Sequence, residues 1–123
     1  MAALIRPKSD TDSDRDEIPA GTLYLLILKT LAVGGRLHGY EIAESIQDCS
    51  DEVLQVEEGS LYPALQRLLK EGLLQSEAGI SAKGRPTRVY RLTNSGVGHL
   101  EREVTSFEKM FTGITRVLAV AKV

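Results

Sequence analysis

Residues 81–92, SAKGRPTRVYRL, gather basic side chains and contain no acidic one. The basic residues are Lys83, Arg85, Arg88 and Arg91. Cations around a glycine and a proline can pair with nucleic-acid phosphates or enter a minor groove, although a solvated loop has the same composition. The chain has a formal net charge of −2, whereas residues 60–91 hold six basic and two acidic residues. This uneven distribution permits a polyanionic partner.

A second candidate contact lies upstream, in residues 59–72 (GSLYPALQRLLKEG). Leu61, Leu65 and Leu68 recur at helical spacing and predict a helix. Ser60 is the expected N-cap, because Pro63 then falls in the first turn, where its missing N–H has no helical acceptor.

An α-helix fits the DNA major groove and reads base edges mainly with its first turns. Glutamine pairs with adenine, and arginine pairs with guanine or a phosphate. The expected contacts on this helix are Ser60, Leu61, Tyr62, Gln66, Arg67 and Lys70. The alternative is that Ser60 only caps the helix, Tyr62 only packs and Arg67 is solvated.

The surrounding elements must position these two contacts. Residues 20–35 and 38–48 predict two further helices, the first apolar over most of its circumference and therefore central. Residues 73–79 and 87–93 predict a two-stranded hairpin, since β-branched and aromatic residues dominate the second strand. The hairpin tip carries the expected contacts Lys83, Gly84, Arg85 and Arg88. The fold class is mainly α with a small β-hairpin, in the order of a winged helix-turn-helix.

Residues 93–123 predict a terminal helix, capped by Thr93 or Asn94. Apolar residues along it alternate between spacings of three and four, which is a heptad pattern typical of helix pairing. We expect this seam to form a homodimer. Its residues are Leu100, Val104, Phe107, Phe111, Ile114 and Leu118.

Other function classes receive no support. Cys49 is the single cysteine, which excludes an intramolecular disulfide and favours a reducing, cytoplasmic setting. His38, Cys49 and His99 lack metal-ligand spacing, and no catalytic or phosphate-loop motif is present, so neither an enzyme nor a cofactor is expected. No signal peptide or membrane span is expected. Residues 1–17 include the acidic stretch DTDSDRDE and predict a flexible tail.

Four segments together resemble the PadR family of transcriptional regulators. They are GTLYLLILKTL, LHGYEIAESI, VLQVEEGSLYPALQRLLKEGLL and GRPTRVYRLTNSG, and the resemblance covers residues 21–118. It implies a winged helix-turn-helix DNA-binding domain over residues 18–92, followed by a dimerisation helix over 93–123. The wing departs from the family pattern, because Pro86 and Thr87 interrupt its basic run and Val89 replaces an aromatic residue.

The resemblance also implies further site residues. His38, Gly39 and Tyr40 open the second helix, where a phosphate contact by Tyr40 is expected, the alternative being a core tyrosine. Some family members hold an apolar effector between the first and last helices, which is an alternative role for Phe107 and Phe111.

Together these observations predict a homodimeric, sequence-specific DNA-binding regulator, most simply a repressor on an inverted repeat, with effector control at the dimer interface. One alternative is a winged-helix module that binds a protein rather than DNA. Another is a small-molecule sensor without any role on DNA.

Overall fold

The computed structural model describes residues 18–121. The predicted tail over residues 1–17 lies outside the described residues, as do the last two residues of the predicted terminal segment. The described chain forms four helices and a three-stranded sheet. In chain order they are α1 (Ala20–Gly34), β1 (Leu37–His38), α2 (Gly39–Cys49), α3 (Glu58–Lys70), β2 (Leu74–Ile80), β3 (Pro86–Leu92) and α4 (Asn94–Leu118).

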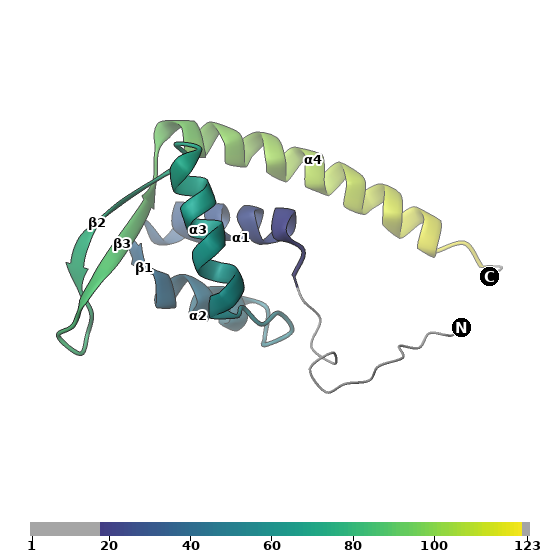
Figure 1. The fold of residues 1–123 in the computed structure, drawn as a ribbon. Coiled ribbons are helices and arrows are strands. Elements are labelled where there is room, and N and C mark those ends of the chain that lie inside the picture. Colours follow the sequence, from purple (N-terminus) through teal and green to yellow (C-terminus); the bar gives the residue numbers. More distant parts are fainter. Residues whose placement is uncertain (1–17, 122–123) are drawn as a thin grey trace.

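Helix α1 lies at the centre of the fold, between α4 and α2, and α3 runs across it (Figure 1). Its apolar character explains this place, because it packs against neighbours in several directions. Ile27 and Leu28 are fully buried, and leucines from α3 and isoleucines from α2 complete the core around them. The prediction of a central first helix is confirmed.

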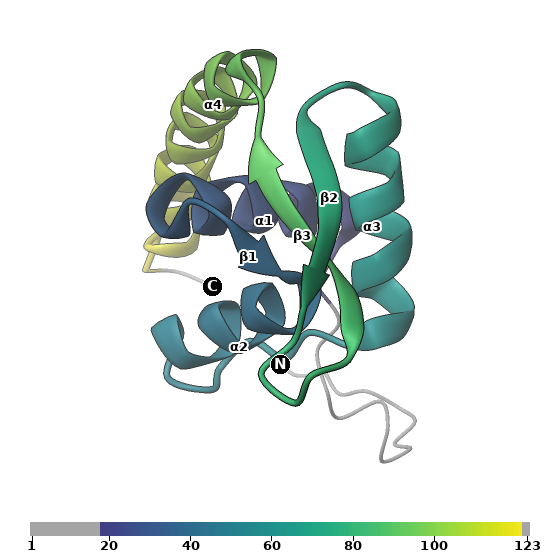
Figure 2. The same ribbon diagram turned by 90° about the vertical axis from the view of Figure 1, so that its left-hand side faces the viewer.

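The sheet is antiparallel with the order β1-β3-β2 (Figure 2), and its long hairpin projects from the helices (Figure 1). Leu74 pairs with Leu92 at the base of the hairpin, and Ile80 pairs with Pro86 near its tip. The two-residue strand β1, absent from the sequence prediction, pairs Leu37 with Tyr90. It attaches the start of α2 to the hairpin.

Helix α3 begins at Glu58, so the prediction that Ser60 is its N-cap is wrong. The carbonyl of Glu57 accepts hydrogen bonds from the N–H groups of Ser60 and Leu61, which adds a turn before the expected start. Pro63 therefore lies inside the helix, on an exposed side where water can satisfy the Gly59 carbonyl that the proline leaves without a helical partner.

Helix α4 is capped by Thr93, whose hydroxyl accepts a hydrogen bond from the N–H of Gly96, as one of the two predicted caps. Gly96 is buried, and a Cβ at this position would stand 2.2 Å from the carbonyl oxygen of Leu73. Only glycine permits this approach of the helix to the base of the hairpin.

Candidate nucleic-acid interface

The exposed side of α3 is polar, as predicted for a surface that contacts DNA. Ser60, Tyr62, Gln66, Arg67 and Lys70 are all exposed on it. Successive helical residues lie about 100° apart, so these five share one arc, and the leucines lie on the opposite one.

Leu61 does not belong to this surface. Its side chain is 1% exposed and lies in the core beside Leu65 and Leu68. The prediction that Leu61 contacts DNA is wrong, because the residue between two exposed neighbours on a helix points to a different side.

The start of α2 adjoins the start of α3. Gly39 is buried, and a Cβ there would lie 3.1 Å from the Tyr62 hydroxyl oxygen. The absence of a side chain lets Tyr62 pack closely, and the predicted contact of Gly39 with DNA stays a prediction. Tyr40 is 39% exposed and stacks on the half-buried His38, with ring centroids 5.3 Å apart. Tyr40 is thus available at the surface rather than in the core.

The hairpin tip is an ordered turn built around Ser81. Its hydroxyl accepts hydrogen bonds from the N–H groups of Lys83 and Arg85, at 3.3 and 3.1 Å, and its N–H donates to the carbonyl of Arg85. Gly84 has a φ of 80°, a conformation that favours glycine. The turn therefore presents Lys83 and Arg85 to solvent from a defined backbone.

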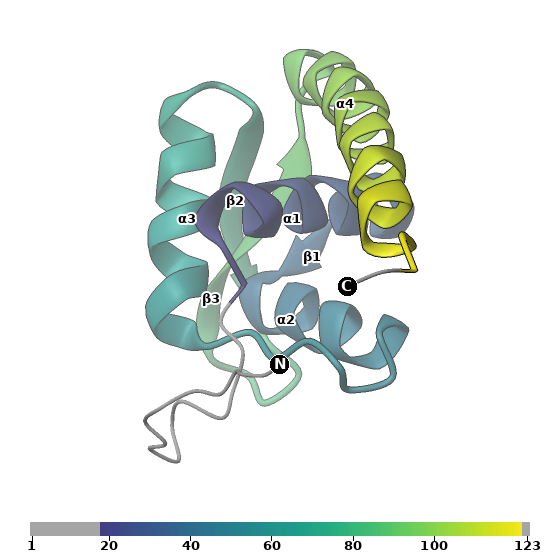
Figure 3. The same cartoon turned by 90° about the vertical axis from the view of Figure 1, so that its right-hand side faces the viewer.

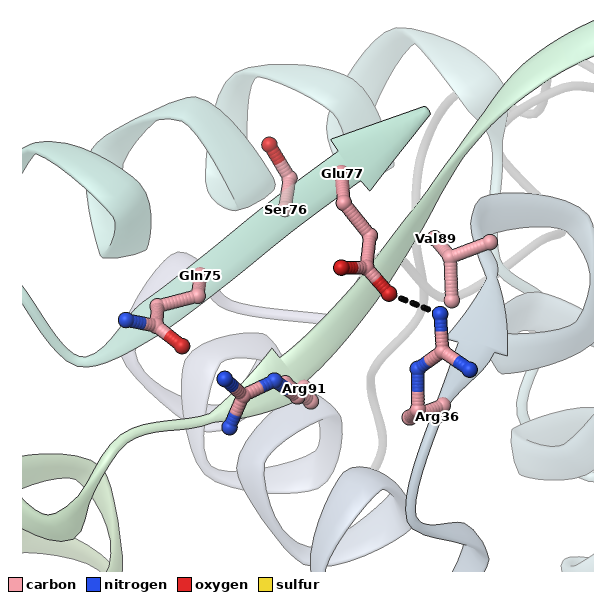
Figure 4. A pocket seen from close by; sticks show the side chains of 6 residues that line it. All are labelled: Arg36, Gln75, Ser76, Glu77, Val89 and Arg91. Carbon is pink, nitrogen blue, oxygen red and sulfur yellow. Dashed lines mark hydrogen bonds and ion pairs between the residues drawn. The ribbon is translucent and has the colours of Figure 1, made fainter. Parts of the chain in front are cut away.

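The other two basic residues of the hairpin lie on opposite faces of the sheet. Arg88 donates a hydrogen bond of 2.8 Å to the Ser76 hydroxyl on β2. Arg91 lies beside Gln75 on the other face, where Arg36 forms an ion pair with Glu77 (Figure 4). Because strand side chains alternate, the four cations of residues 81–92 do not form one cluster.

The pairing of Glu71, just beyond α3, with Arg67 was not predicted from the sequence. Glu71 accepts a hydrogen bond of 2.6 Å from the Nε of Arg67. This hydrogen bond and the nearby charge raise the pKa of the Arg67 guanidinium above its usual value. The spacing of four residues was the available signal.

The start of α3 and the hairpin tip lie at the same end of the molecule in both views (Figures 1 and 2). Strand β1 brings the start of α2 to this end as well. The start of α3, the start of α2 and the exposed basic turn between β2 and β3 thus lie toward one end of the described molecule.

The predicted seam of α4 divides into two halves. Leu100 is 7% exposed and belongs to the core of its own protomer, so its assignment to a dimer contact is wrong. Val104 is half-buried against the same core. Beyond it the apolar side is exposed, and the Phe107 and Phe111 rings stack at 6.1 Å. We call Phe107, Phe111, Ile114 and Leu118 the α4 stripe.

Leu100 belongs to a core cluster that includes residues of α1, and Val104 packs against this cluster. The alternative of an effector between α1 and α4 stays a prediction. A largely apolar groove of about 440 Å³ lies between α1 and α2, lined by side chains that include Leu26, Ile46 and Cys49. Within residues 18–121, no helix has the length and apolarity needed to cross a membrane.

Three short helices with a hairpin wing define a winged helix-turn-helix protein. Residues 27–102 match the family described as "Transcriptional regulator PadR-like family". The match covers more than half of the chain, and the chain therefore belongs to the PadR-like family of transcriptional regulators.

Individual proteins that resemble this chain are also transcriptional regulators. A transcriptional regulator from Mycobacterium tuberculosis is 37% identical over 79 residues, which are 64% of this chain and 70% of the relative. A regulator from Clostridium thermocellum has a similar structure, with a TM-score of 0.70, 30% identity, and coverage of 78% of this chain and 92% of that one. The structure of Bacillus subtilis PadR in complex with operator DNA matches with a TM-score of 0.61 at 27% identity, covering 70% of this chain and 48% of that one.

Proposed function

We propose that the protein binds operator DNA as a homodimer and represses transcription. Each α3 enters the major groove of one half-site of an inverted repeat, and the two half-sites lie about one helical turn, or 34–36 Å, apart. The hairpin tip reaches the adjacent backbone or minor groove. Occupancy of the operator then blocks access of the polymerase.

The polar side of α3 supports base reading by Gln66, whose amide can pair with adenine, and by Arg67, which can pair with guanine or a phosphate. Ser60, Tyr62 and Lys70 suit the DNA backbone, which positions the helix without reading sequence. Tyr40 extends this backbone contact from α2. Lys83, Arg85 and Arg88 supply the wing cations, Arg88 after release from Ser76.

The observation that carries the proposal is the exposed polar side of α3, a helix whose start lies toward the same end of the molecule as the ordered basic turn between β2 and β3 (Figures 1 and 2). The structure of Bacillus subtilis PadR in complex with operator DNA, which resembles this chain, supports operator binding.

Exposure of the α4 stripe supports the homodimer. Phe111 is 59% and Leu118 77% exposed, so the stripe has apolar area that one protomer leaves in water. Burial of such area is favourable by about 25 cal/mol per Å². An effector bound between the two copies of α4 would change the separation of the two α3 helices, for which a coupling of about 1–3 kcal/mol suffices.

Duplex binding is tested by fluorescence anisotropy on DNA from upstream of the protein's own gene, over a range of salt concentrations. The Lys83→Ala and Arg85→Ala double variant is expected to lower the slope of log affinity against log salt by about 0.9 for each lost phosphate contact. The matched control replaces Lys109 and Arg116, exposed cations of α4, with alanine and is expected to keep the slope.

Reporter transcription from the same DNA tests repression, which is expected to fall with the wing variant. Gln66→Ala is expected to cost about 1–3 kcal/mol on the operator and little on unrelated duplexes. Salt-insensitive binding, or a wing variant that binds duplex like the wild type while the dimer stays intact, would favour the protein-binding module instead.

A further inference from the structure

A groove of about 690 Å³ runs between the start of α1 and the exposed side of α3. Figure 3 shows these two segments side by side. Four of the α3 residues assigned above to DNA line it, together with side chains from the first turn of α1 and the residues before it. The α3 residues are Ser60, Gln66, Arg67 and Lys70. The groove therefore overlaps the proposed reading surface.

The chemistry of the groove suits an acidic ligand. Lys70 and Arg67 contribute cations, while Ser60, Gln66 and Tyr24 can donate hydrogen bonds to carboxylates. Glu71 already accepts such a bond from Arg67, which shows that this guanidinium engages a carboxylate on the α3 surface. The groove also has an apolar part, formed by Leu23, Ala64 and other small or aliphatic side chains.

The chain enters the described structure at this groove, because Ile18 lines it. Immediately before Ile18 lies the acidic segment, residues 10–17 (DTDSDRDE), with five carboxylates and one guanidinium. Four aspartates occupy alternate positions, so an extended chain would direct them to one side. They are Asp10, Asp12, Asp14 and Asp16.

Length permits contact along the whole of α3. Eight extended residues reach about 26–29 Å. The thirteen residues of α3 span about 20 Å. Residue 17 is covalently joined to Ile18, so the segment is held beside the groove at an effective concentration of the order of mM.

We propose that this groove binds the chain's own acidic segment, residues 10–17, and that the segment and DNA exclude each other at α3. Carboxylates of the segment pair with Lys70 and Arg67 in the absence of DNA, and phosphates displace them. The exclusion of DNA rests on the proposed function, whereas the occupancy of the groove does not. The consequence is a lower affinity for weakly bound, nonspecific duplexes.

The affinity test compares the full chain with a variant in which Asp10, Asp12, Asp14 and Asp16 are replaced by asparagine. A segment that binds its groove with a dissociation constant of about 0.1 mM, at an effective concentration of about 1 mM, lowers affinity about tenfold. The variant is therefore expected to bind a random duplex about tenfold more tightly at low salt, and the gain is expected to shrink as salt screens the contact.

The control variant removes the same number of charges from exposed positions at the far end of α2 and beyond. Its substitutions are Glu44→Gln, Asp48→Asn, Asp51→Asn and Glu52→Gln. An equal gain in affinity for both variants would reduce the effect to net charge and overturn the proposal.

A second measurement needs no DNA. Carbodiimide cross-linking of the full chain, read by mass spectrometry, is expected to join residues 10–17 to Lys70 at low salt and to lose this product at high salt. Equal yields at Lys29 and Lys109, exposed lysines outside the groove, would overturn the proposal. A cross-link between residues 10–17 and Lys70 found only in products of twice the chain mass would place the segment on a second copy and overturn the contact within one chain. A specific Lys70 cross-link in a protein that binds no duplex would refute the proposed function and leave the groove assignment standing.

Discussion

Helices α3 and α4 both carry apolar residues at helical spacing, but they bury them to different degrees. On α3, Leu61 and Leu65 are at most 1% exposed, and the apolar side is covered within one protomer. On α4 the coverage stops after Val104, and Ile114 is 49% exposed. Spacing thus specifies an apolar face without specifying what covers it.

The difference separates two kinds of surface. Because α3 is anchored by its leucines, its exposed polar side keeps a fixed position relative to the wing. Because the second half of α4 has no cover within the described protomer, its stripe is the part that gains most from a second copy. Helix α3 thus carries the surface that we propose for DNA, and α4 carries the surface that we propose for the homodimer.

Among the substitutions that test this comparison, replacing a core leucine of α3 should change the free energy of unfolding most. Leu65→Ala is expected to lower the free energy of unfolding by about 2–5 kcal/mol, because it leaves a cavity in the core. Urea unfolding measures the loss, which should be the same at every protein concentration. Phe111→Ala should change stability by less than about 0.5 kcal/mol in dilute protein and by more as concentration rises. A concentration-independent loss with Phe111→Ala would place the stripe in the protomer core.

Two glycines of α4 give the next contrast. Gly96→Ala is expected to cost about 1–3 kcal/mol, because the new Cβ meets the Leu73 carbonyl oxygen at 2.2 Å. Gly113→Ala, with nothing within 4 Å of its Cβ, should stabilise the protomer by about 0.5–1 kcal/mol through helix propensity. Thermal unfolding in dilute protein distinguishes the two. Stabilisation by Gly96→Ala would contradict the close packing of α4 on the hairpin.

A smaller effect is expected from the ion pair on the polar side of α3. Glu71→Gln should change stability little, since exposed ion pairs are screened by solvent and contribute little. It should nevertheless raise duplex affinity, because Arg67 becomes available to a phosphate or base. Anisotropy and urea unfolding on the same variant measure both quantities. A large loss of stability with no change in DNA affinity would make the pair structural.

The smallest effect is confined to alkaline pH. Burial is the main cause that raises the pKa of Tyr90 above its usual value near 10, so the folded state holds this proton more tightly than the unfolded state. The resulting contribution to stability is fully present below the unfolded-state pKa and is lost as pH rises through the folded-state pKa. Tyr90→Phe should flatten stability in this range, as measured by urea unfolding across pH. An unchanged pH profile in the variant would exclude Tyr90 as the source.

Much of the fold is readable from local patterns. Repeated leucines predict α3, and alternation around Val89 predicts a strand, because each pattern reports one buried face of a single element. Strand β1 escapes prediction, since two residues carry no periodicity and Leu37 pairs with the distant Tyr90. The start of α3 could not be predicted either, because the first hydrogen bonds of the helix go to the backbone carbonyl of Glu57 rather than to a capping side chain.

The candidate site is partly readable too. Exposure of Gln66 and Arg67 follows from the helical arc opposite the leucines, and the same geometry explains why Leu61 does not belong with them. Burial of Gly39 beneath Tyr62 could not be predicted, because it depends on how two helices meet. The heptad pattern could not assign Leu100 to its own protomer, since a seam looks the same whichever surface covers it.

Helix α4 packs on its own protomer through its first turns, so a tilt at that end moves the far end of the helix. Leu118 lies eighteen positions beyond Leu100, a length of about 27 Å. A tilt of about 5° at the anchored end therefore displaces the far end by about 2 Å. Small changes in packing at the hairpin base are magnified in this way. In the proposed homodimer, the distance between the two copies would therefore depend on a few contacts near Gly96.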